Sequence, residues 1–308
     1  MYRQIQVMRA FLVFFIVMSG CVDSVADNKR TTDGKNFTNL NGTVMVWIAP
    51  GRVEADVRVV DPVQPAVPVS RRTTIEIKRG FWLASMETTL SQFKAFLEDS
   101  KYTPASVTSA GKRLVHSVDS ITGAPVVGKG AWNAPGFPQS DDHPVTTVSV
   151  EDAVAFCEWM SRREKRMYRL PNEDEWHFAL LSSPREMAKE NLQDQAFQAR
   201  FPTKAKAAYD WNDGFVYTAP VGQFRSTKNG LFDMGGNVAE LTSPMKPSDY
   251  PLKLKAVIQG GDWEADTRSP REGDRVYLRA SGMTPTWGFR VACESAVVTI
   301  QDGPVRLD

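Results

Sequence analysis

The fold expected for this chain is decided by Gly230–Leu241, which reads GLFDMGGNVAEL. Two carboxylates, Asp233 and Glu240, flank a Gly-Gly-Asn turn, and its glycines permit the tight curvature that points carbonyl oxygens inward. Hard oxygen ligands gathered in this way suit calcium. A hairpin between two apolar strands with solvated acids is the alternative interpretation. Other segments of the chain decide between the two.

Three further segments share one pattern with this stretch. They are Arg169–Trp176 (RLPNEDEW), Gly260–Trp263 (GGDW) and Gly288–Arg290 (GFR). Together, the four segments resemble the formylglycine-generating enzyme (sulfatase-modifying factor) family. The resemblance covers roughly residues 43–295. It implies a single α+β domain with low regular secondary structure, the sulfatase-modifying-factor fold, which is a variant of the C-type-lectin-like fold. We expect this domain over residues 43–297 and a short tail over 298–308.

The composition permits a substantial core and argues against electrostatic capture. Of the 308 residues, 42% are hydrophobic, 10% aromatic and 24% charged, with a formal net charge of +1. This charge argues against binding of nucleic acid or acidic lipid. The basic run Ser161–Arg166 is interpreted as the solvated last turn of a helix. His116, His143 and His177 lie far apart in the sequence and form no metal-binding spacing.

The N-terminus has the pattern of an exported bacterial lipoprotein. Arg3 and Arg9 precede the apolar run Ala10–Met18, which is too short to be a stable bilayer anchor. The tetrad Met18–Cys21 resembles a lipobox, so Cys21 would be acylated. Cleavage of a plain signal peptide is the alternative. We expect a signal peptide over 1–21, a flexible tether over 22–42, and a lipid-anchored protein of the bacterial cell envelope.

Local patterns predict three helix starts and one hairpin. Thr89, Ser149 and Asn172 each stand at an N-cap position before an apolar repeat of helical spacing. Glu175 is placed to complete a capping box with Asn172. The β-rich runs 43–48 and 53–60, separated by a Pro-Gly pair, predict a hairpin. The region from 182 to 210 is ambiguous between a helix and a loop.

The resemblance implies one or two structural calcium ions. In the first site, side-chain oxygens would come from Asp233 and Glu240, and backbone carbonyls from Gly236 and Val238. The second site would use Asp213 and the carbonyl of Phe215, completed near Gln195 and Ala196, although the family usually has Asn where this chain has Gln195. Both ions would pin loops that lack regular hydrogen bonding. Metal-free turns are the alternative at both places.

The three cysteines separate this chain from the family's oxidases. If Cys21 is acylated, Cys157 and Cys293 remain as an even pair in an oxidising compartment. Family members that join this helix to the final strand by a disulfide imply a Cys157–Cys293 bridge. Two buried free thiols are the alternative. The copper-binding cysteines of the family's oxidases would fall near Ala265 and Pro270, where this chain has none, so no copper is expected.

Two more expectations concern the end of the chain. Arg290 is expected to form an internal pair with an acid at the start of the third helix, Glu173 or Glu175, and we select Glu175. Tryptophans in loop-rich regions are candidates for the wall of a groove; they are Trp132, Trp211, Trp263 and Trp287.

The expected function is therefore a calcium-stabilised binding or assembly module. It would be lipid-anchored, and its partner would be an envelope protein or a glycan rather than a nucleic acid. The alternatives are a formylglycine-generating oxidase acting on sulfatase cysteines and an inactive partner of exported sulfatases. The missing copper cysteines favour a chain that is not an enzyme.

Overall fold

A computed structural model describes residues 34–60, 69–109, 115–183, 189–204, 206–243, 256–266, 274–278 and 282–295. Cys21, most of the predicted tether and the predicted tail over 298–308 lie outside these residues. The chain divides into two compact units, Met1–Arg30 and Thr31–Asp308, and all described residues belong to the second. No helix within the described ranges has both the length and the apolarity needed to cross a membrane.

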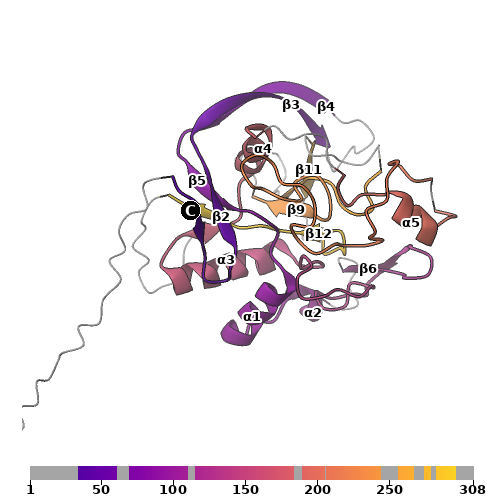
Figure 1. The fold of residues 1–308 in the computed structure, drawn as a ribbon. Helices are drawn as coiled ribbons and strands as arrows, with labels where there is room; N and C mark the ends of the chain where they lie inside the picture. The colour runs from indigo at the N-terminus through magenta and orange to yellow at the C-terminus, as the bar shows by residue number, and fades with distance from the viewer. Residues whose placement is uncertain are drawn as a thin grey trace, which may run out of the picture. The chain divides into compact units, whose positions relative to one another are not determined.

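An antiparallel sheet, a mixed sheet and a separate hairpin carry the domain (Figure 1). The first sheet has the order β1 (Phe37–Thr38), β2 (Val44–Ile48), β5 (Phe81–Ala84), β13 (Ala292–Glu294) and β8 (Tyr168–Arg169). The second has the order β12 (Trp287–Gly288), β9 (Ala239–Thr242), β10 (Ala256–Gln259), β11 (Asp274–Leu278), β3 (Gly51–Val60) and β4 (Val69–Ile77). The separate hairpin pairs β6 (His116–Val118) with β7 (Pro125–Val127).

The predicted helix starts are confirmed. Thr89 caps α1 (Leu90–Ser100), Ser149 caps α3 (Val150–Glu164) and Asn172 caps α4 (Glu173–Leu181), each in a capping box. Two shorter helices, α2 (Ala105–Thr108) and α5 (Gln195–Arg200), lie in regions where the sequence predicted loops or left the state open. These starts could be predicted because a capping box depends only on residues within three positions of the N-cap.

The predicted hairpin between 43–48 and 53–60 is wrong. β2 pairs with β1 and β5, whereas β3 pairs with β4 and β11, so the two strands belong to different sheets. The burial explains the separation: Met45, Val46 and Ile48 are all buried, as in a strand covered on both faces. β3 alternates, with Ala55 and Val57 buried between exposed charged residues, as in a strand with one solvated face.

Two apolar clusters fill the space between these layers. The larger joins α1 and α3 to the first sheet, through residues such as Phe93, Phe156 and Phe289. The second joins α4 to β3 and β4, with Trp176 fully buried. Figure 1 shows α4 beneath the curved β3–β4 ribbon, while α3 and α1 lie on the other side of the domain. The segment Gly230–Leu241 lies between the two clusters, since Leu231 and Met234 belong to one and Ala239 and Leu241 to the other.

Asp152 fixes the loop that follows α1 onto the start of α3. Its Oδ2 accepts the backbone N–H of Ser149 at 2.8 Å, which completes the capping box. Its Oδ1 accepts the hydroxyl of Tyr102 at 3.0 Å and the backbone N–H of Ala105 at 2.8 Å. Asp152 is fully buried together with Ser149, whereas Tyr102 and Ala105 are half-buried.

We predict that Asp152→Ala destabilises the fold more than Ser149→Ala. Loss of the Ser149 cap should cost about 1 kcal/mol, whereas Asp152→Ala leaves one buried and two half-buried donors without their acceptor and should cost about 2–3 kcal/mol. Urea unfolding followed by tryptophan fluorescence measures both losses. Equal losses would show that Asp152 acts only as part of the helix cap.

Candidate functional site

The stretch that predicted the fold forms a tightly curved loop leading into β9. Asp233 and Asn237 both have a positive φ, of 58° and 66°. Gly236 is needed because a Cβ there would lie 2.7 Å from the carbonyl oxygen of Asn191. The buried Asn237 side chain donates to Glu87 Oε1 and accepts the backbone N–H of Ala219 at 2.8 Å. The loop is thus held from three sides by chain segments that are distant in sequence.

Glu240 and Arg290 form a fully buried ion pair at the centre of the domain. Arg290 Nη2 lies 2.6 Å from Glu240 Oε1, and Arg290 Nε lies 2.7 Å from Oε2. Trp176 Nε1 also donates to Glu240 Oε2, at 2.8 Å. The exposed fractions of the two charged side chains are 0% and 1%. Both carboxylate oxygens are therefore engaged.

The predicted pairing of Arg290 with Glu175 is wrong. Glu175 instead accepts two hydrogen bonds from Arg169, at 2.6 and 2.7 Å, and caps the backbone of Asn172. Arg169 reaches Glu175 from the short strand just before α4. Because Arg169 already pairs with Glu175, the counter-ion of Arg290 is Glu240 on β9.

Asp233 faces a second acid, Glu87, which follows β5. Asp233 Oδ2 accepts the backbone N–H of Gly222 at 2.6 Å, while Asp233 Oδ1 and Glu87 Oε2 are buried with no recorded partner. Burial, and then the charge of Asp233, raises the pKa of Glu87 well above its usual range. Burial likewise raises the pKa of Asp233. Burial therefore favours the protonated form of both carboxyls.

The residues of the first predicted calcium site lie together but face other partners. Gly236 and Val238 are buried beside Asp233 and Glu240. However, the carboxylate of Glu240 is taken by Arg290, and a calcium ion bound to it would lie next to that guanidinium. Two cations at such a short distance in a buried place repel strongly. The described residues contain no cluster of three or more Asp, Glu, His or Cys suited to a metal.

The residues of the second predicted calcium site bond to other protein groups, and Asp194 lies among them. The side chain of Gln195 bonds to Asp210, and the backbone N–H of Ala196 donates to the α5 cap, Asp194. Asp194 Oδ2 in turn accepts the backbone N–H of Asp213 at 2.6 Å. Asp213 Oδ1 accepts the N–H of Phe215, but its Oδ2 is buried with no recorded partner.

The charge at this second place fits a cation. Burial raises the pKa of Asp213 to about 7, and the nearby Asp194 adds repulsion to that effect. Two carboxylates with one uncommitted buried oxygen are a hard-oxygen donor set of the kind that calcium takes. The sequence analysis did not include Asp194, because the sequence shows only its role as a helix cap and not its hydrogen bond to the backbone N–H of Asp213.

A cavity of about 130 Å³ lies beside the Gly-Gly-Asp-Trp segment. Its lining comes from the β6–β7 hairpin, Glu264 and Thr284–Trp287. Trp263 supports it from beneath: its ring packs 5.6 Å from that of Phe137, and its Nε1 donates to the carbonyl of Pro285 at 3.1 Å. Lys204 bonds to both Glu264 and the carbonyl of Gly123, which closes one side.

The chemistry of this cavity is polar, acidic and aromatic. Glu264 and Asp262 are neighbouring acids, and burial raises the pKa of Asp262 to about 7 with a contribution from Glu264. His116 and the half-buried Trp287 belong to the lining. Of the four tryptophans expected at a groove, only Trp287 lines this cavity. Trp263 is core, Trp132 packs on the main core, and Trp211 donates to the carbonyl of Glu190.

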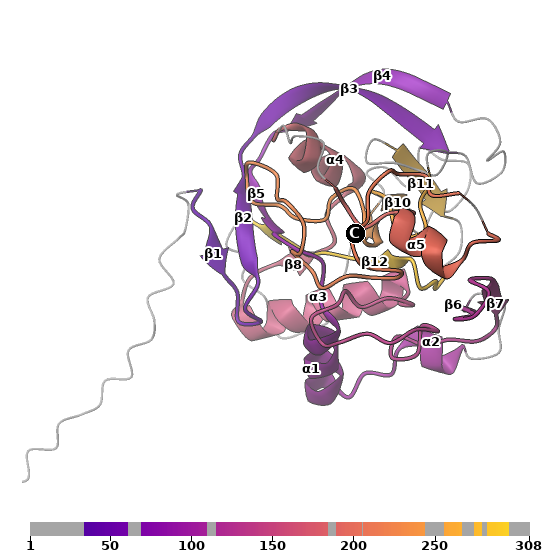
Figure 2. The same ribbon diagram turned by 45° about the vertical axis from the view of Figure 1, so that its right-hand side comes forward.

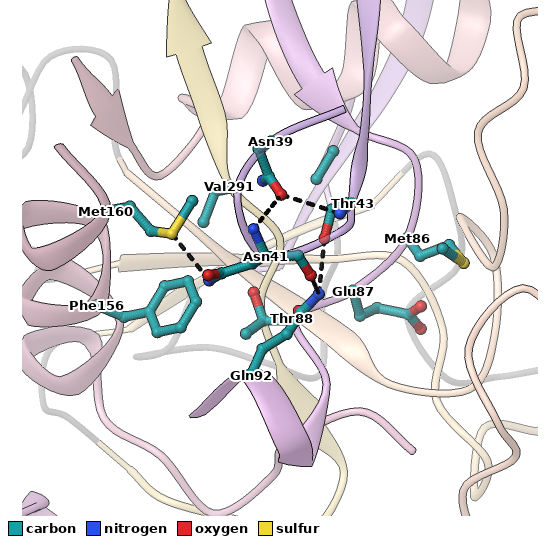
Figure 3. A pocket seen from close by; sticks show the side chains of 11 residues that line it. Asn39, Asn41, Thr43, Met86, Glu87, Thr88, Gln92, Phe156, Met160 and Val291 are labelled. Carbon is teal, nitrogen blue, oxygen red and sulfur yellow. Dashed lines mark hydrogen bonds between the residues drawn. The ribbon is translucent and has the colours of Figure 1, made fainter. Parts of the chain in front are cut away.

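A much smaller space lies near Glu87 (Figure 3). Its volume is about 10 Å³, which suits a single water molecule. Asn39 closes it by accepting the N–H groups of Asn41 and Thr43, and Gln92 donates to Thr43 Oγ1 at 2.7 Å. This space is too small for a substrate, so the cavity beside Glu264 is the candidate binding site.

The comparison with protein families agrees with this architecture. The model of the "Sulfatase-modifying factor enzyme 1-like domain" matches residues 31–295. The chain belongs to this family. Its expected fold is thereby confirmed, and a solved structure, PvdO from Pseudomonas aeruginosa, shows the same fold: the TM-score is 0.61 at 20% identity, covering 85% of this chain and 98% of PvdO.

Individual relatives match a smaller part of this chain than the family model does. The "Inactive C-alpha-formylglycine-generating enzyme 2" of Mus musculus is 33% identical over 193 residues, which cover 54% of this chain and 56% of that protein. The formylglycine-generating enzyme of Mycobacterium tuberculosis is 35% identical over 125 residues, covering 36% and 38%. That of Streptomyces coelicolor is 28% identical over 221 residues, covering 63% and 67%. The chain spans about half the length of the first relatives it matches.

The two cysteines in the described part of the chain lie in the core. Cys157 on α3 and Cys293 on β13 are both buried free thiols that belong to the main apolar cluster. Burial raises the pKa of both, that of Cys293 to about 12. The predicted Cys157–Cys293 bridge is therefore not formed in this structure. Neither cysteine lines the cavity. Of the two positions where the family's copper cysteines would fall, Ala265 is buried next to Glu264 in the chain and Pro270 lies outside the described residues.

We predict that Arg290→Met costs about 3–5 kcal/mol, because it leaves the Glu240 carboxylate buried without its counter-ion. Arg169→Met is the matched control, since Arg169 also pairs with glutamates but its side chain is 26% exposed. It should cost less than half as much. Denaturant unfolding measures both, and equal losses would contradict the central role of the Arg290–Glu240 pair. The double variant Arg290→Met/Glu240→Met should lose less than the sum of the single variants.

We predict that neither Cys157 nor Cys293 reacts with a thiol reagent in the native protein, because both are buried and both thiols have raised pKa values. Mass spectrometry after alkylation of the unreduced protein, native and then denatured, measures this. Two alkylated cysteines after denaturation would support free thiols, whereas none would establish the disulfide that the family resemblance implies.

Proposed function

We propose that this chain is an exported, lipid-anchored binding module that uses the cavity beside Glu264 to hold a protein segment or a glycan, and that it does not oxidise cysteine. One observation carries the proposal. Its three cysteines are Cys21 in the lipobox-like segment and the two core thiols, Cys157 and Cys293. A copper site of the family's kind needs two cysteines that reach a substrate, and none remains for that task.

The size and lining of the cavity support a binding role. At about 130 Å³ it is smaller than the pockets that enclose whole small molecules, which start at about 300 Å³. It suits one side chain of a partner or one sugar ring. An aromatic wall from Trp287 and hydrogen-bonding groups on Glu264, His116 and Thr286 fit either of these.

The names of the relatives support the absence of oxidation without deciding it. The Mus musculus relative is named an inactive enzyme, whereas others are named formylglycine-generating enzymes. The alternatives for this chain are a formylglycine-generating oxidase acting on sulfatase cysteines and an inactive partner of exported sulfatases. The second would use the same cavity to hold a sulfatase segment.

The anchor and the cellular place are part of the proposal. Cys21 would carry the acyl chains and hold the domain in the bacterial cell envelope. Replacing Cys21 with Ser should release the protein from washed membranes without detergent. Retention of the Cys21→Ser protein on those membranes would refute the lipid anchor.

Calcium is proposed at the Asp213 loop, where Asp194 and Asp213 would hold the ion and the Phe215 carbonyl lies close by in the chain. There it would pin the loop that connects α5 to the Gly230–Leu241 stretch. The first predicted set, around Asp233 and Glu240, stays a prediction. A calcium ion there would have to lie beside Arg290.

We predict that a chelator lowers the melting temperature and that Asp213→Asn removes this response. Loss of calcium present at about 100 times its Kd would cost about 3 kcal/mol. Thermal unfolding with calcium or with a chelator is the measurement. Asp210→Asn is the matched control and should respond like the unaltered protein. A chelator without effect on the unaltered protein would refute the calcium proposal.

We predict that the protein leaves a sulfatase-type Cys-x-Pro-x-Arg peptide unchanged in the presence of calcium, copper, reductant and oxygen. Mass spectrometry of the peptide tests this, with a cysteine-containing family enzyme as the active control. Conversion of the peptide cysteine to the aldehyde would mean that oxidation proceeds without a copper cysteine pair, and the proposed function would fall.

A further inference from the structure

An aromatic ladder runs across the part of the domain where the described chain begins. The ring of Trp47 packs 4.8 Å from that of Trp82, and Phe37 packs 5.5 Å from Trp82 on its other side. The guanidinium of Arg166 lies 4.4 Å above the ring of Phe37. The first described residues lie on this ladder: Trp82 Nε1 donates to the carbonyl of Lys35 at 2.9 Å.

Exposed cations surround the ladder. Lys35 lies on it, and Arg79 precedes Gly80, whose backbone is so close to Trp47 that a Cβ would lie 2.2 Å from that ring. Arg163 and Lys165 come from the end of α3, where Arg163 covers the ring of Trp159 at 4.7 Å. We call the surface formed by Lys35, Leu40, Arg79 and Lys165 the entry face.

The entry face also carries an exposed apolar side chain. Leu40 has an exposed fraction of 67%, although its backbone N–H is fixed to Glu164 Oε1 at 2.8 Å. The acid that makes this contact also accepts the hydroxyl of Tyr168, so its charge is partly engaged. Leu40 is thus held out to solvent by a well-bonded turn.

The local charge differs from that of the whole chain. A net charge of +1 argued against capture by acidic lipid, but that sum hides the clustering of cations from three separate segments. The basic run at the end of α3 was interpreted as a solvated turn. The fold places it beside Lys35 and the aromatic ladder, which the sequence alone does not indicate.

A lipid surface matches this combination of groups. Cations near an anionic bilayer, with aromatic rings and an apolar side chain at the same level, are the features of interfacial membrane contact. Roughly a dozen residues separate Cys21 from Gly34. Fully extended, such a segment reaches at most about 45 Å, so an acylated Cys21 would hold Gly34 within about that distance of the bilayer.

We propose that the entry face docks on an anionic lipid bilayer and sets the orientation of the domain on the membrane. This proposal rests on the proposed function only for the location of the protein at a membrane. The docking itself depends on charged residues of the folded domain. Figure 2 shows β6 and β7, which line the cavity, on the side of the domain away from β1. A domain docked in this way presents its cavity away from the lipid, toward partners.

The test measures binding of the unacylated unit Thr31–Asp308, which forms a compact unit of its own, to lipid vesicles. Vesicles of phosphatidylglycerol with phosphatidylcholine should sediment the protein, while phosphatidylcholine alone should not, and added salt should release it. The triple variant Lys35→Glu/Arg79→Glu/Lys165→Glu should bind about a hundredfold more weakly, because each cation contributes about fivefold near an anionic surface.

The matched control changes three exposed cations elsewhere, as Arg71→Glu/Lys206→Glu/Lys228→Glu, with the same change in net charge. It should bind within about threefold of the unaltered unit, because the three altered residues do not belong to the entry face. Equal loss in both variants or equal binding to neutral vesicles would overturn the proposal. The Cys21→Ser fractionation reports on the anchor alone, so failure of docking and failure of the anchor are distinguishable.

Discussion

The buried pair of Arg290 and Glu240 is the contact on which the arrangement of this domain depends. Arg290 donates to Glu240, to the carbonyls of Ala84 and Ser85 at 3.1 and 3.2 Å, and to the carbonyl of Phe232 at 2.8 Å. A buried ion pair is costly unless its geometry is good and its remaining donors are satisfied. Here both conditions hold.

The pair fixes the loop and the binding site relative to each other. Glu240 on β9 is opposite Gly288 on β12, and Trp287 is opposite Ala239, so the cavity wall runs directly into the segment that carries Arg290. The wall is held further by Ala239, whose N–H donates to the carbonyl of Thr286 at 3.0 Å. A change at the ion pair therefore reaches the cavity through two hydrogen-bonded neighbours.

The parts of the fold that depend on neighbouring residues were predictable, whereas the choice of distant partners was not. The caps at Thr89, Ser149 and Asn172 are set by side chains within three residues, so the sequence contained all of the signal. The predicted acid for Arg290 was Glu175, selected from Glu173 and Glu175 at the start of the third helix. Arg169 neutralises Glu175 locally, and only the packing of β9 against Arg290 reveals Glu240.

The candidate site shows the same division. The Gly-Gly-Asp-Trp segment pointed to the right part of the chain, but the cavity also needs a hairpin more than a hundred residues earlier and the Thr284–Trp287 wall. Likewise, Asp194 is a plain helix cap in the sequence, and its meeting with Asp213 depends on how the α5 loop returns. The cysteines were countable from the sequence, but their burial in one core cluster was not.

That burial supports the central proposal, that this chain does not oxidise cysteine. Copper(I) binding measures it most directly, by competition with a chromophoric chelator, in the unaltered protein and in Cys157→Ala and Cys293→Ala. The account predicts that the protein retains no copper(I) against the chelator, and that the variants behave identically. One copper(I) per chain, lost on substitution of either core cysteine, would contradict it.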